Sequence, residues 1–310
     1  MKADTYELKG ILGKERIFVV PTFQRDYEWT QEGQWELLFE DLNGLADRLY
    51  SARYQTSGVE SAQKVSAEKQ VAPHFLGAIV CDQVPTSTGD IDTRAVIDGQ
   101  QRLTTLQLLL RGLLDVLQES NSSRVPRVKR LLVNPDDVVS QEHPEHRYKL
   151  WPRRKDRVIW PAAMKDETPP NDVADHPYVK ARRFFAEQIR AVKNTLDDDS
   201  RLDEITDALL DLFKIVVIDL DENDDAQIIF EVLNGRQTAL SASDLVKNLL
   251  FLRAERATEH VEDLYDQYWA EFDHKWWKTQ IGTGHAARQR RDQLLSVWLT
   301  AASGDSASVA

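Results

Sequence analysis

The chain has 310 residues, of which 42% are hydrophobic, so it is long enough to bury one large core or two ordinary ones. Its formal net charge of −12 excludes a protein that coats nucleic acid unspecifically, because such binding needs a surplus of lysine and arginine facing phosphate. No apolar run is long enough for a membrane span and the first ten residues lack the apolar centre of a signal peptide, so we expect a cytoplasmic protein with no membrane partner.

The first third of the chain predicts alternating strand and helix. A short strand is expected at 17–21, then a polar-aromatic segment, then an amphipathic helix in which apolar residues recur at three- and four-residue steps from Trp35 to Leu49. Residues 51–72 show no such period and predict a mobile loop.

Two β-rich runs at 74–84 and 93–99 follow, and the turn residues between them predict a hairpin. The only cysteine, Cys81, lies in the first run. It excludes intrachain disulfides and thiolate zinc clusters, and we expect a core thiol. A helix from about Gln101 carries leucines on one face and should pack on the hairpin.

The remaining chain predicts more helix than strand. Residues 120–178 suggest an irregular insertion with short elements, and a strand at 214–220 interrupts the helical pattern that starts at 178. Beyond that strand the pattern is helical, with a turn at 235–240, a helix from Ser241 and a Trp-rich tail after residue 260. The fold class is therefore mixed α/β.

The sequence Asp98-Gly99-Gln100-Gln101-Arg102, here called the DGQQR turn, lies between a strand pattern and a helix pattern. A helix N-terminus carries unpaired N–H groups and about half a positive charge, so it favours an anion such as phosphate. Gly99 would allow close approach, the glutamines can donate amide N–H groups, and Arg102 can fork onto phosphate oxygens. Asp98 would be a metal ligand, a base for water, or a partner of the arginine. The alternative is an N-cap aspartate followed by surface glutamines.

A second stretch, "VPTFQRDYEWT", places Gln24 and Arg25 among the aromatic residues Phe23, Tyr27 and Trp29. This composition suits stacking on a base or guarding a pocket. The alternative is a helix-entry loop whose aromatic side chains anchor it to the core.

A third stretch, residues 228–251, contains a capping-box pattern formed by Ser241 and Asp244. Polar residues before and within the following helix could converge on an anion, or could be turn residues and a solvated face. These residues are Asn234, Arg236, Lys247 and Asn248.

The chain contains four separated motifs, which are, in order, "VPTFQRDYEW", "FLGAIV", "VIDGQQRLTTL" and "FEVLNGRQTALSASDLVKN". Over about residues 5–255 they resemble the N-terminal domain of the GmrSD-type modification-dependent restriction proteins. The resemblance implies a ParB/sulfiredoxin-like α/β core with a larger, mainly helical remainder. The implied segments are a nucleotide-binding core at 1–120, a portion at 121–255 that completes the family domain, and a helical extension at 256–310.

The same resemblance implies an NTP-hydrolysing, DNA-modification-sensing domain of an antiphage restriction system that licenses a nuclease module or partner protein. The alternative is a nucleotide-gated DNA-binding module without turnover. The implied ligands are modified DNA and a nucleoside triphosphate, either GTP, ATP or CTP, with Mg²⁺; homo-oligomerisation is left open. The implied catalytic residues are Asp98, Gln101 and Arg102. The implied nucleotide-binding residues are Gly99, Gln100, Thr104, Asn234, Arg236, Lys247 and Asn248. The residues expected to sense DNA or its modification are Phe23, Gln24, Arg25, Tyr27 and Trp29.

The chain departs from the family pattern in two ways. Gln237 stands where much of the family has a glycine after the arginine that corresponds to Arg236 in "FEVLNGRQTALSASDLVKN". We also find no His-Asn-His nuclease module, so cleavage is expected to come from a further C-terminal region or a second protein. The histidines are scattered except for His143 and His146, a pair predicted to be solvated rather than metal-bound.

Residues 147–157, "RYKLWPRRKDR", hold six cationic side chains against one acidic and are here called the 147–157 island. Interleaved with Tyr148 and Trp151, they predict phosphate contact and stacking, with DNA contacts assigned to Arg153, Arg154 and Lys155. The alternative is an exposed charged loop that balances nearby acidic runs. A weaker second island consists of Arg288, Arg290 and Arg291.

Overall fold

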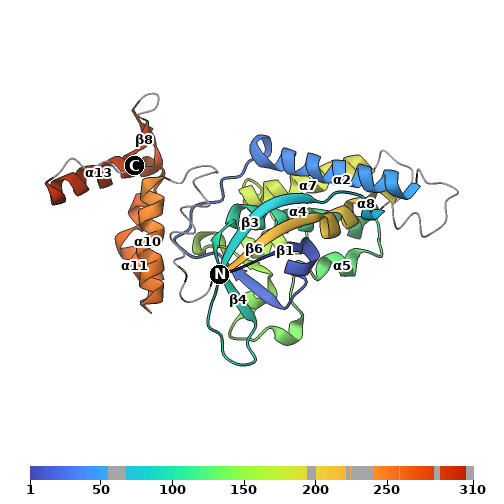
Figure 1. Cartoon of the computed structure of the whole chain (residues 1–310), viewed down its shortest axis with the longest axis horizontal. Helices are drawn as coiled ribbons and strands as arrows, with labels where there is room; N and C mark the ends of the chain where they lie inside the picture. Colours follow the sequence, from blue (N-terminus) through green and yellow to red (C-terminus); the bar gives the residue numbers. More distant parts are fainter. Residues whose placement is uncertain are drawn as a thin grey trace. The chain divides into compact units, whose positions relative to one another are not determined.

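The computed structural model describes residues 1–54, 68–193, 200–220, 224, 241–257, 259–282 and 287–304. Residue contacts divide the chain into two compact units, described here one at a time (Figure 1). The first unit comprises Met1–Val20 and Tyr27–Asp224, and the second comprises Pro21–Asp26 and Asp225–Ala310. The three functional segments expected from the sequence follow other boundaries and stay a prediction.

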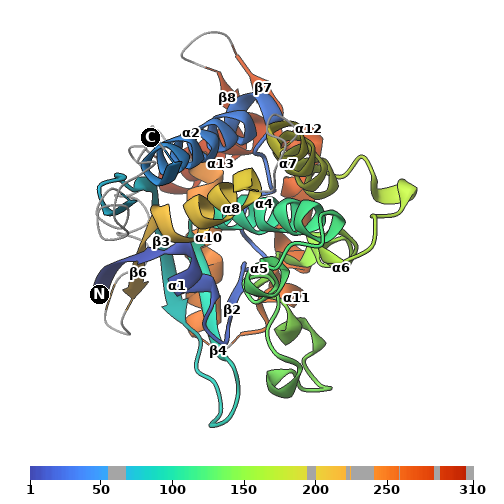
Figure 2. The same ribbon diagram turned by 90° about the vertical axis from the view of Figure 1, so that its right-hand side faces the viewer.

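A six-stranded mixed sheet of order β1-β6-β3-β4-β2-β5 forms the centre of the first unit (Figure 2). Its strands are β1 (Lys2–Glu7), β2 (Arg16–Val19), β3 (His74–Gln83), β4 (Asp92–Asp98), β5 (Leu150–Trp151) and β6 (Phe213–Leu220). The β1–β6 and β3–β4 pairs are antiparallel, and the other three pairs are parallel. The predicted hairpin is confirmed as β3 and β4, and the mixed α/β class is confirmed as well.

Strand β1 escaped the sequence analysis because Lys2–Glu7 has no apolar run and most of its side chains face outward. It is an edge strand, paired along its length with β6. An edge strand needs little apolar surface, so its pattern is weak.

Helices and short turns cover the sheet. They are α1 (Leu8–Leu12), η1 (Gln31–Trp35), α2 (Glu36–Tyr54), α4 (Gln100–Glu119), α5 (Val125–Lys129), η2 (Asp136–Val138), η3 (Pro144–Arg147), η4 (Arg154–Asp156), α6 (Trp160–Met164), η5 (Asn171–Val173), α7 (Pro177–Lys193), α8 (Ser200–Asp207) and η6 (Ala208–Leu212). The predicted insertion with short elements at 120–178 is therefore confirmed. Most of the segment expected to be a mobile loop, 55–67, lies outside the described residues.

Helix α4 is buried around most of its circumference, whereas the sequence predicted one buried face. It shares one core with the hairpin residues Ile79, Cys81 and Val96, and its other side lies along α7. A methyl group added at Gly112 would lie 2.8 Å from the carbonyl oxygen of Arg182, so the two helix backbones approach closely there. The extra burial follows from that second helix layer, which the pattern of α4 alone does not reveal.

Cys81 is fully buried, and burial raises the pKa of its thiol to about 12. The prediction of a core thiol is confirmed.

The second unit contains short elements around a small aromatic core. Its elements are α10 (Ala242–Arg256), α11 (Val261–Tyr268), η7 (Ala270–Asp273), α12 (Lys275–Lys278), β7 (Gln280–Ile281), β8 (Arg288–Gln289) and α13 (Arg290–Ser303). Phe23, Phe251, Tyr265 and Trp269 form the core. The strands β7 and β8 were not expected from the sequence, because strands of two residues are too short to give a periodic pattern. In the part of the chain that is described, no helix has the length and apolar character needed to cross a membrane.

Candidate functional site

The DGQQR turn joins the end of β4 to the start of α4. Gly99 is the N-cap residue and has a φ of 88°, in the left-handed region that favours glycine. A methyl group there would lie 2.7 Å from the Ile79 side chain and 3.1 Å from the Ala78 carbonyl oxygen, so the turn is pressed against β3.

The alternative interpretation of this stretch, an N-cap aspartate followed by surface glutamines, is wrong. The N-cap residue is Gly99 rather than Asp98, and no side chain caps the helix. Gln100 and Gln101 are both buried, as is Thr104.

Arg102 lies against the backbone of β3. One of its Nη1 hydrogens is donated to the Ala78 carbonyl oxygen. Gly77, with a φ of 97°, makes room for it, because a methyl group there would lie 2.9 Å from the Arg102 Nη2 atom. The β3–β6 pairing is irregular between Phe75 and Ala78, which is the irregularity that a glycine inside a strand often marks. Gly77 is part of the "FLGAIV" motif, so this signal was present in the sequence.

The Arg102 guanidinium has no carboxylate within ion-pair distance among the described residues, although it is half-buried. Burial lowers the pKa of Arg102, and the negative charge of Asp98 opposes that effect. A partly buried cation without a paired anion is costly unless a ligand supplies the anion.

Gln101 connects the turn to the stretch "VPTFQRDYEWT". Its Oε1 atom accepts a hydrogen bond from the backbone N–H of Glu28 at 2.8 Å. Thr105 donates to the Gln101 carbonyl oxygen at 2.8 Å, so its hydroxyl accepts from Tyr27 at 2.7 Å. The Tyr27 oxygen in turn accepts from Trp35 Nε1 at 2.9 Å. Hydrogen bonds therefore run from Trp35 through Tyr27 and Thr105 to the Gln101 carbonyl oxygen at the start of α4.

Burial raises the pKa of Tyr27 to about 12, so its hydroxyl keeps its proton at neutral pH. The sequence analysis missed Thr105 and Trp35, because nothing in their spacing shows that Tyr27 would join them.

Phe23, Gln24 and Arg25 belong to the second unit. Phe23 stacks on Phe251 with ring centroids 5.7 Å apart, and Gln24 is buried. The aromatic anchor expected as the alternative therefore describes Phe23, and the sensing role of these three residues stays a prediction.

Lys247 also belongs to the second unit, where it is buried between carboxylates. Its Nζ lies 3.3 Å from Asp273 and 3.6 Å from Asp244, and Arg291 binds the same two carboxylates at 2.9 Å each. Burial lowers the pKa of Lys247. One half of the expected capping box is present, because Ser241 Oγ accepts from the Asp244 N–H at 3.2 Å, and the Asp244 carboxylate accepts from the Ser241 hydroxyl at 2.7 Å.

The anion site expected around α10 stays a prediction. Asn248 is half-buried on the same helix, but Asn234, Arg236 and Gln237 lie outside the described residues. In the described part, Lys247 has carboxylate partners, so it offers an anion less than a free lysine would.

Trp29 lines a pocket of 510 Å³ in the first unit, between η1 and α7. The aromatic lining residues are Tyr27, Trp29, Trp35 and Phe184. The charged lining residues are Glu28, Glu32, Asp175, Lys180, Arg183 and Glu187.

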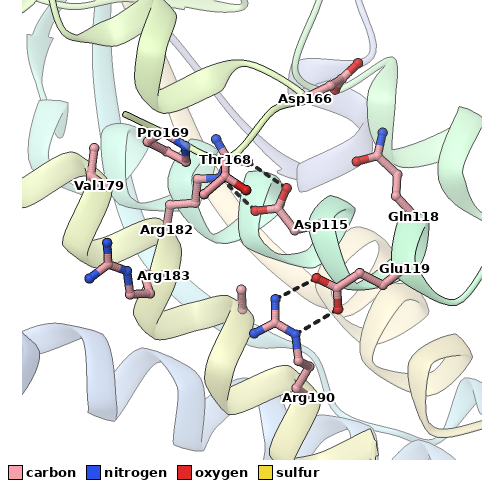
Figure 3. A pocket seen from close by; sticks show the side chains of 11 residues that line it. Asp115, Gln118, Glu119, Asp166, Thr168, Pro169, Val179, Arg182, Arg183 and Arg190 are labelled. Atoms are coloured by element: carbon pink, nitrogen blue, oxygen red, sulfur yellow. Dashed lines mark hydrogen bonds and ion pairs between the residues drawn. The ribbon is translucent and has the colours of Figure 1, made fainter. Parts of the chain in front are cut away.

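A second pocket of 270 Å³ lies between α4 and α7 (Figure 3). Figure 3 shows two ion pairs across the two helices: Arg182 binds Asp115 at 2.7 Å, and Arg190 binds Glu119 at 2.8 Å. These pairs fasten the two helices, and Arg183 is a further lining cation for which the described residues show no ion pair.

The 147–157 island divides into structural and exposed cations. Lys149 is buried and donates to the Lys14 carbonyl oxygen at 2.6 Å, and burial lowers its pKa to about 8. Arg153 is buried and binds Asp156 at 2.8 Å. Arg154 and Lys155 are exposed, as is Arg147. Neither interpretation of the island fits all of it, because β5 carries its centre into the sheet.

In the second island, Arg291 is the buried partner of Asp244 and Asp273 described above. Arg290 lies over the Trp276 ring at 4.5 Å, and Arg288 is exposed.

Comparison with known proteins gives one family and no curated match. The family model described as "GmrSD restriction endonuclease, N-terminal domain" matches residues 8–251, which runs from α1 through most of α10. The match includes the DGQQR turn and the other three motifs. The chain therefore belongs to the family of the GmrSD restriction endonuclease N-terminal domain, as its motifs predicted.

Proposed function

We propose that this chain is the NTP-hydrolysing, DNA-modification-sensing domain of a restriction system, and that it licenses a nuclease module or partner protein. Membership of a restriction endonuclease family supports the restriction role. The nucleotide chemistry is argued from the DGQQR turn.

The observation that carries the proposal is the state of Arg102. Among the described residues it is half-buried, makes one hydrogen bond to a carbonyl oxygen, and has no carboxylate partner. A guanidinium has five N–H donors in a fork that suits phosphate oxygens. Arg102 is held against β3 by its contact with Ala78, so a phosphate would meet a positioned cation.

The rest of the turn suits the same ligand. Gly99 brings the backbone close to β3 at the start of a 20-residue helix, whose N-terminus favours negative charge. Asp98 fits Mg²⁺, which takes one or two carboxylates and completes its shell with phosphate oxygens and water. When bound, Mg²⁺ would neutralise phosphate charge. Asp98 would hold it, and Arg102 would stabilise the charge of the terminal phosphate.

Gln101 gives the turn a connection to a sensing segment. Its amide oxygen is held by the Glu28 N–H, next to Tyr27 and Trp29. A displacement of that segment by DNA would therefore act on a proposed catalytic residue directly, through hydrogen bonds that are already present.

The proposal is tested by phosphate release from purified protein with GTP, ATP or CTP and Mg²⁺, with and without modified DNA. We expect turnover by the natural sequence and its loss in Arg102→Ala. Arg48→Ala is a matched control, because Arg48 is an exposed arginine on α2 that does not line the pocket of Tyr27 and Trp29, and it should turn over normally.

The competing function is a nucleotide-gated DNA-binding module without turnover. Nucleotide binding that depends on Arg102, with no phosphate released under any condition, would establish that function instead. If the chain neither binds nucleotide nor releases phosphate, both functions are excluded.

A further inference from the structure

Three potential metal ligands lie together in the turn that precedes β5. Among the described residues, His143, Glu145 and His146 form the group of histidine, cysteine or acidic side chains in which three ligand atoms lie within 4.8 Å of one another. The His143 Nδ1 atom is 3.1 Å from Glu145 Oε1, and the two imidazole rings are 4.8 Å apart between centroids. The structure thus brings together a pair that the sequence analysis expected to be merely solvated.

The backbone of this turn is fixed by hydrogen bonds. The His146 N–H donates to the His143 carbonyl oxygen at 3.1 Å, which closes the 3₁₀ turn. The Asn134 side chain donates from Nδ2 to the His146 carbonyl oxygen at 2.8 Å, and the Asn134 backbone N–H donates to the Arg147 carbonyl oxygen at 2.8 Å. The buried Lys149 ammonium in turn binds the Asn134 side chain. A ligand set on a fixed backbone loses less entropy when it binds an ion.

The side chains need only small movements to reach a common ion. In tetrahedral coordination with bonds of about 2.0–2.1 Å, ligand atoms stand roughly 3.3 Å apart. The His143–Glu145 separation of 3.1 Å is close to that value, and the largest separation in the group, 4.8 Å, exceeds it by roughly 1.5 Å. The imidazole rings are stacked at 16° and must turn to converge, which is easy for His143 because it is exposed.

We propose that His143, Glu145 and His146 form a binding site for a borderline transition-metal ion, Zn²⁺ or Ni²⁺. Two imidazole nitrogens and one carboxylate select such ions over Mg²⁺ and Ca²⁺, which prefer oxygen ligands. Three protein ligands leave a coordination position open to water or an anion. The site does not depend on the proposed nucleotide chemistry, and a bound ion would fix the side chains at the start of the 147–157 island.

The test is a titration of the tag-free, metal-free full chain with Zn²⁺, followed by calorimetry, and with Co²⁺, followed by visible absorption. We expect one ion per chain and no displacement by excess Mg²⁺. His143→Gln and His146→Gln should each weaken binding by at least about tenfold, since even residues that only orient ligands cost that much. Glu145→Gln should weaken it as well.

His274→Gln is the matched control. His274 is also exposed and lies 3.5 Å from Glu271, but among the described residues it belongs to no group of three potential metal ligands. Its removal should leave Zn²⁺ affinity unchanged. Absence of Zn²⁺ and Co²⁺ binding, or equal binding in both His143→Gln and His146→Gln, would overturn the proposal.

A second measurement needs no variant. Zn²⁺ should protect His143 and His146, but not His274, from carbethoxylation by diethylpyrocarbonate in the natural sequence. Equal modification of all three histidines with and without Zn²⁺ would also overturn it.

Discussion

The DGQQR turn and the 147–157 island are both polar stretches that the sequence marks as candidates for phosphate contact, yet the fold treats their arginines differently. Arg102 is held by a carbonyl oxygen and lacks a carboxylate partner among the described residues, whereas Arg153 is consumed by a buried pair with Asp156. Tyr178 also donates to Asp156, at 3.1 Å. A cationic residue in a motif is therefore available to a ligand only where the fold has not already supplied its anion.

The largest effect on stability is expected from Arg153→Ala. It leaves the buried Asp156 carboxylate without its cation, so the free energy of unfolding should fall by about 3 kcal/mol. Arg154→Ala and Lys155→Ala, which change exposed side chains, should each cost less than about 0.5 kcal/mol. Urea denaturation measures all three. Equal losses for Arg153→Ala and Arg154→Ala would show that the pair of Arg153 with Asp156 adds no stability beyond that of an exposed arginine.

The same pair predicts a dependence on acid. Burial raises the pKa of Asp156, but His176, Arg153 and Tyr178 together outweigh it and hold that pKa below its ordinary value of 3.8. A carboxylate with a lowered folded-state pKa stabilises the fold above its ordinary value, and that stabilisation is lost as pH falls through the folded value. Arg153→Ala should therefore flatten the fall in stability below about pH 4.

Gly99→Ala should cost about 2 kcal/mol, measured by thermal or urea unfolding. Left-handed backbone costs an alanine about 1 kcal/mol, and the contacts with Ile79 and Ala78 add to that. Gly89→Ala is the matched control, because Gly89 has a φ of 96° but nothing within 4 Å of an added methyl group. If the two variants lose equal stability, the DGQQR turn is not pressed against β3.

Tyr27→Phe should cost about 1 kcal/mol, because it removes the hydroxyl between Trp35 and Thr105 and leaves the Trp35 Nε1–H without its acceptor, while Thr105 keeps its bond to the Gln101 carbonyl oxygen. Tyr50→Phe is the control, since no hydrogen bond of its hydroxyl is found among the described residues. If the hydrogen bonds through Tyr27 also transmit a DNA signal, Tyr27→Phe should reduce the stimulation of phosphate release by DNA more than it reduces basal release. Equal reductions would separate Tyr27 from sensing.

The smallest change in stability per residue, less than about 0.5 kcal/mol, is expected from the joint replacement of Arg147, Arg154 and Lys155 by alanine. DNA affinity should nevertheless fall almost uniformly across sequences, and the slope of log affinity against log salt should flatten by roughly one unit per lost contact. Arg153 is excluded from this variant because its loss would confound binding with unfolding. An unchanged slope would place the DNA contacts elsewhere.

Long elements with a strong apolar pattern could be predicted from the sequence, because burial of one face imposes a period. The β3–β4 hairpin and helices α2, α4 and α7 belong to this class. Strands β1, β7 and β8 could not, because they are short or carry little apolar surface.

The site was predictable in its residues more than in its contacts. The left-handed Gly99 follows from the need to turn a strand into a helix in one residue. The pairing of Arg153 with Asp156 depends on where β5 and η4 lie, and the bond between Glu28 and Gln101 joins residues 73 positions apart. Such distant contacts leave no mark in local composition.

The close approach of α4 and α7 at Gly112 has a mechanical consequence for any nucleotide-dependent motion. The helices touch through backbone atoms and are fastened by two ion pairs further along, so α4 cannot roll or slide against α7 without breaking both. A change at the DGQQR turn would therefore move the two helices as one rigid lever, or leave them still and displace only the lighter segment around Tyr27 and Glu28.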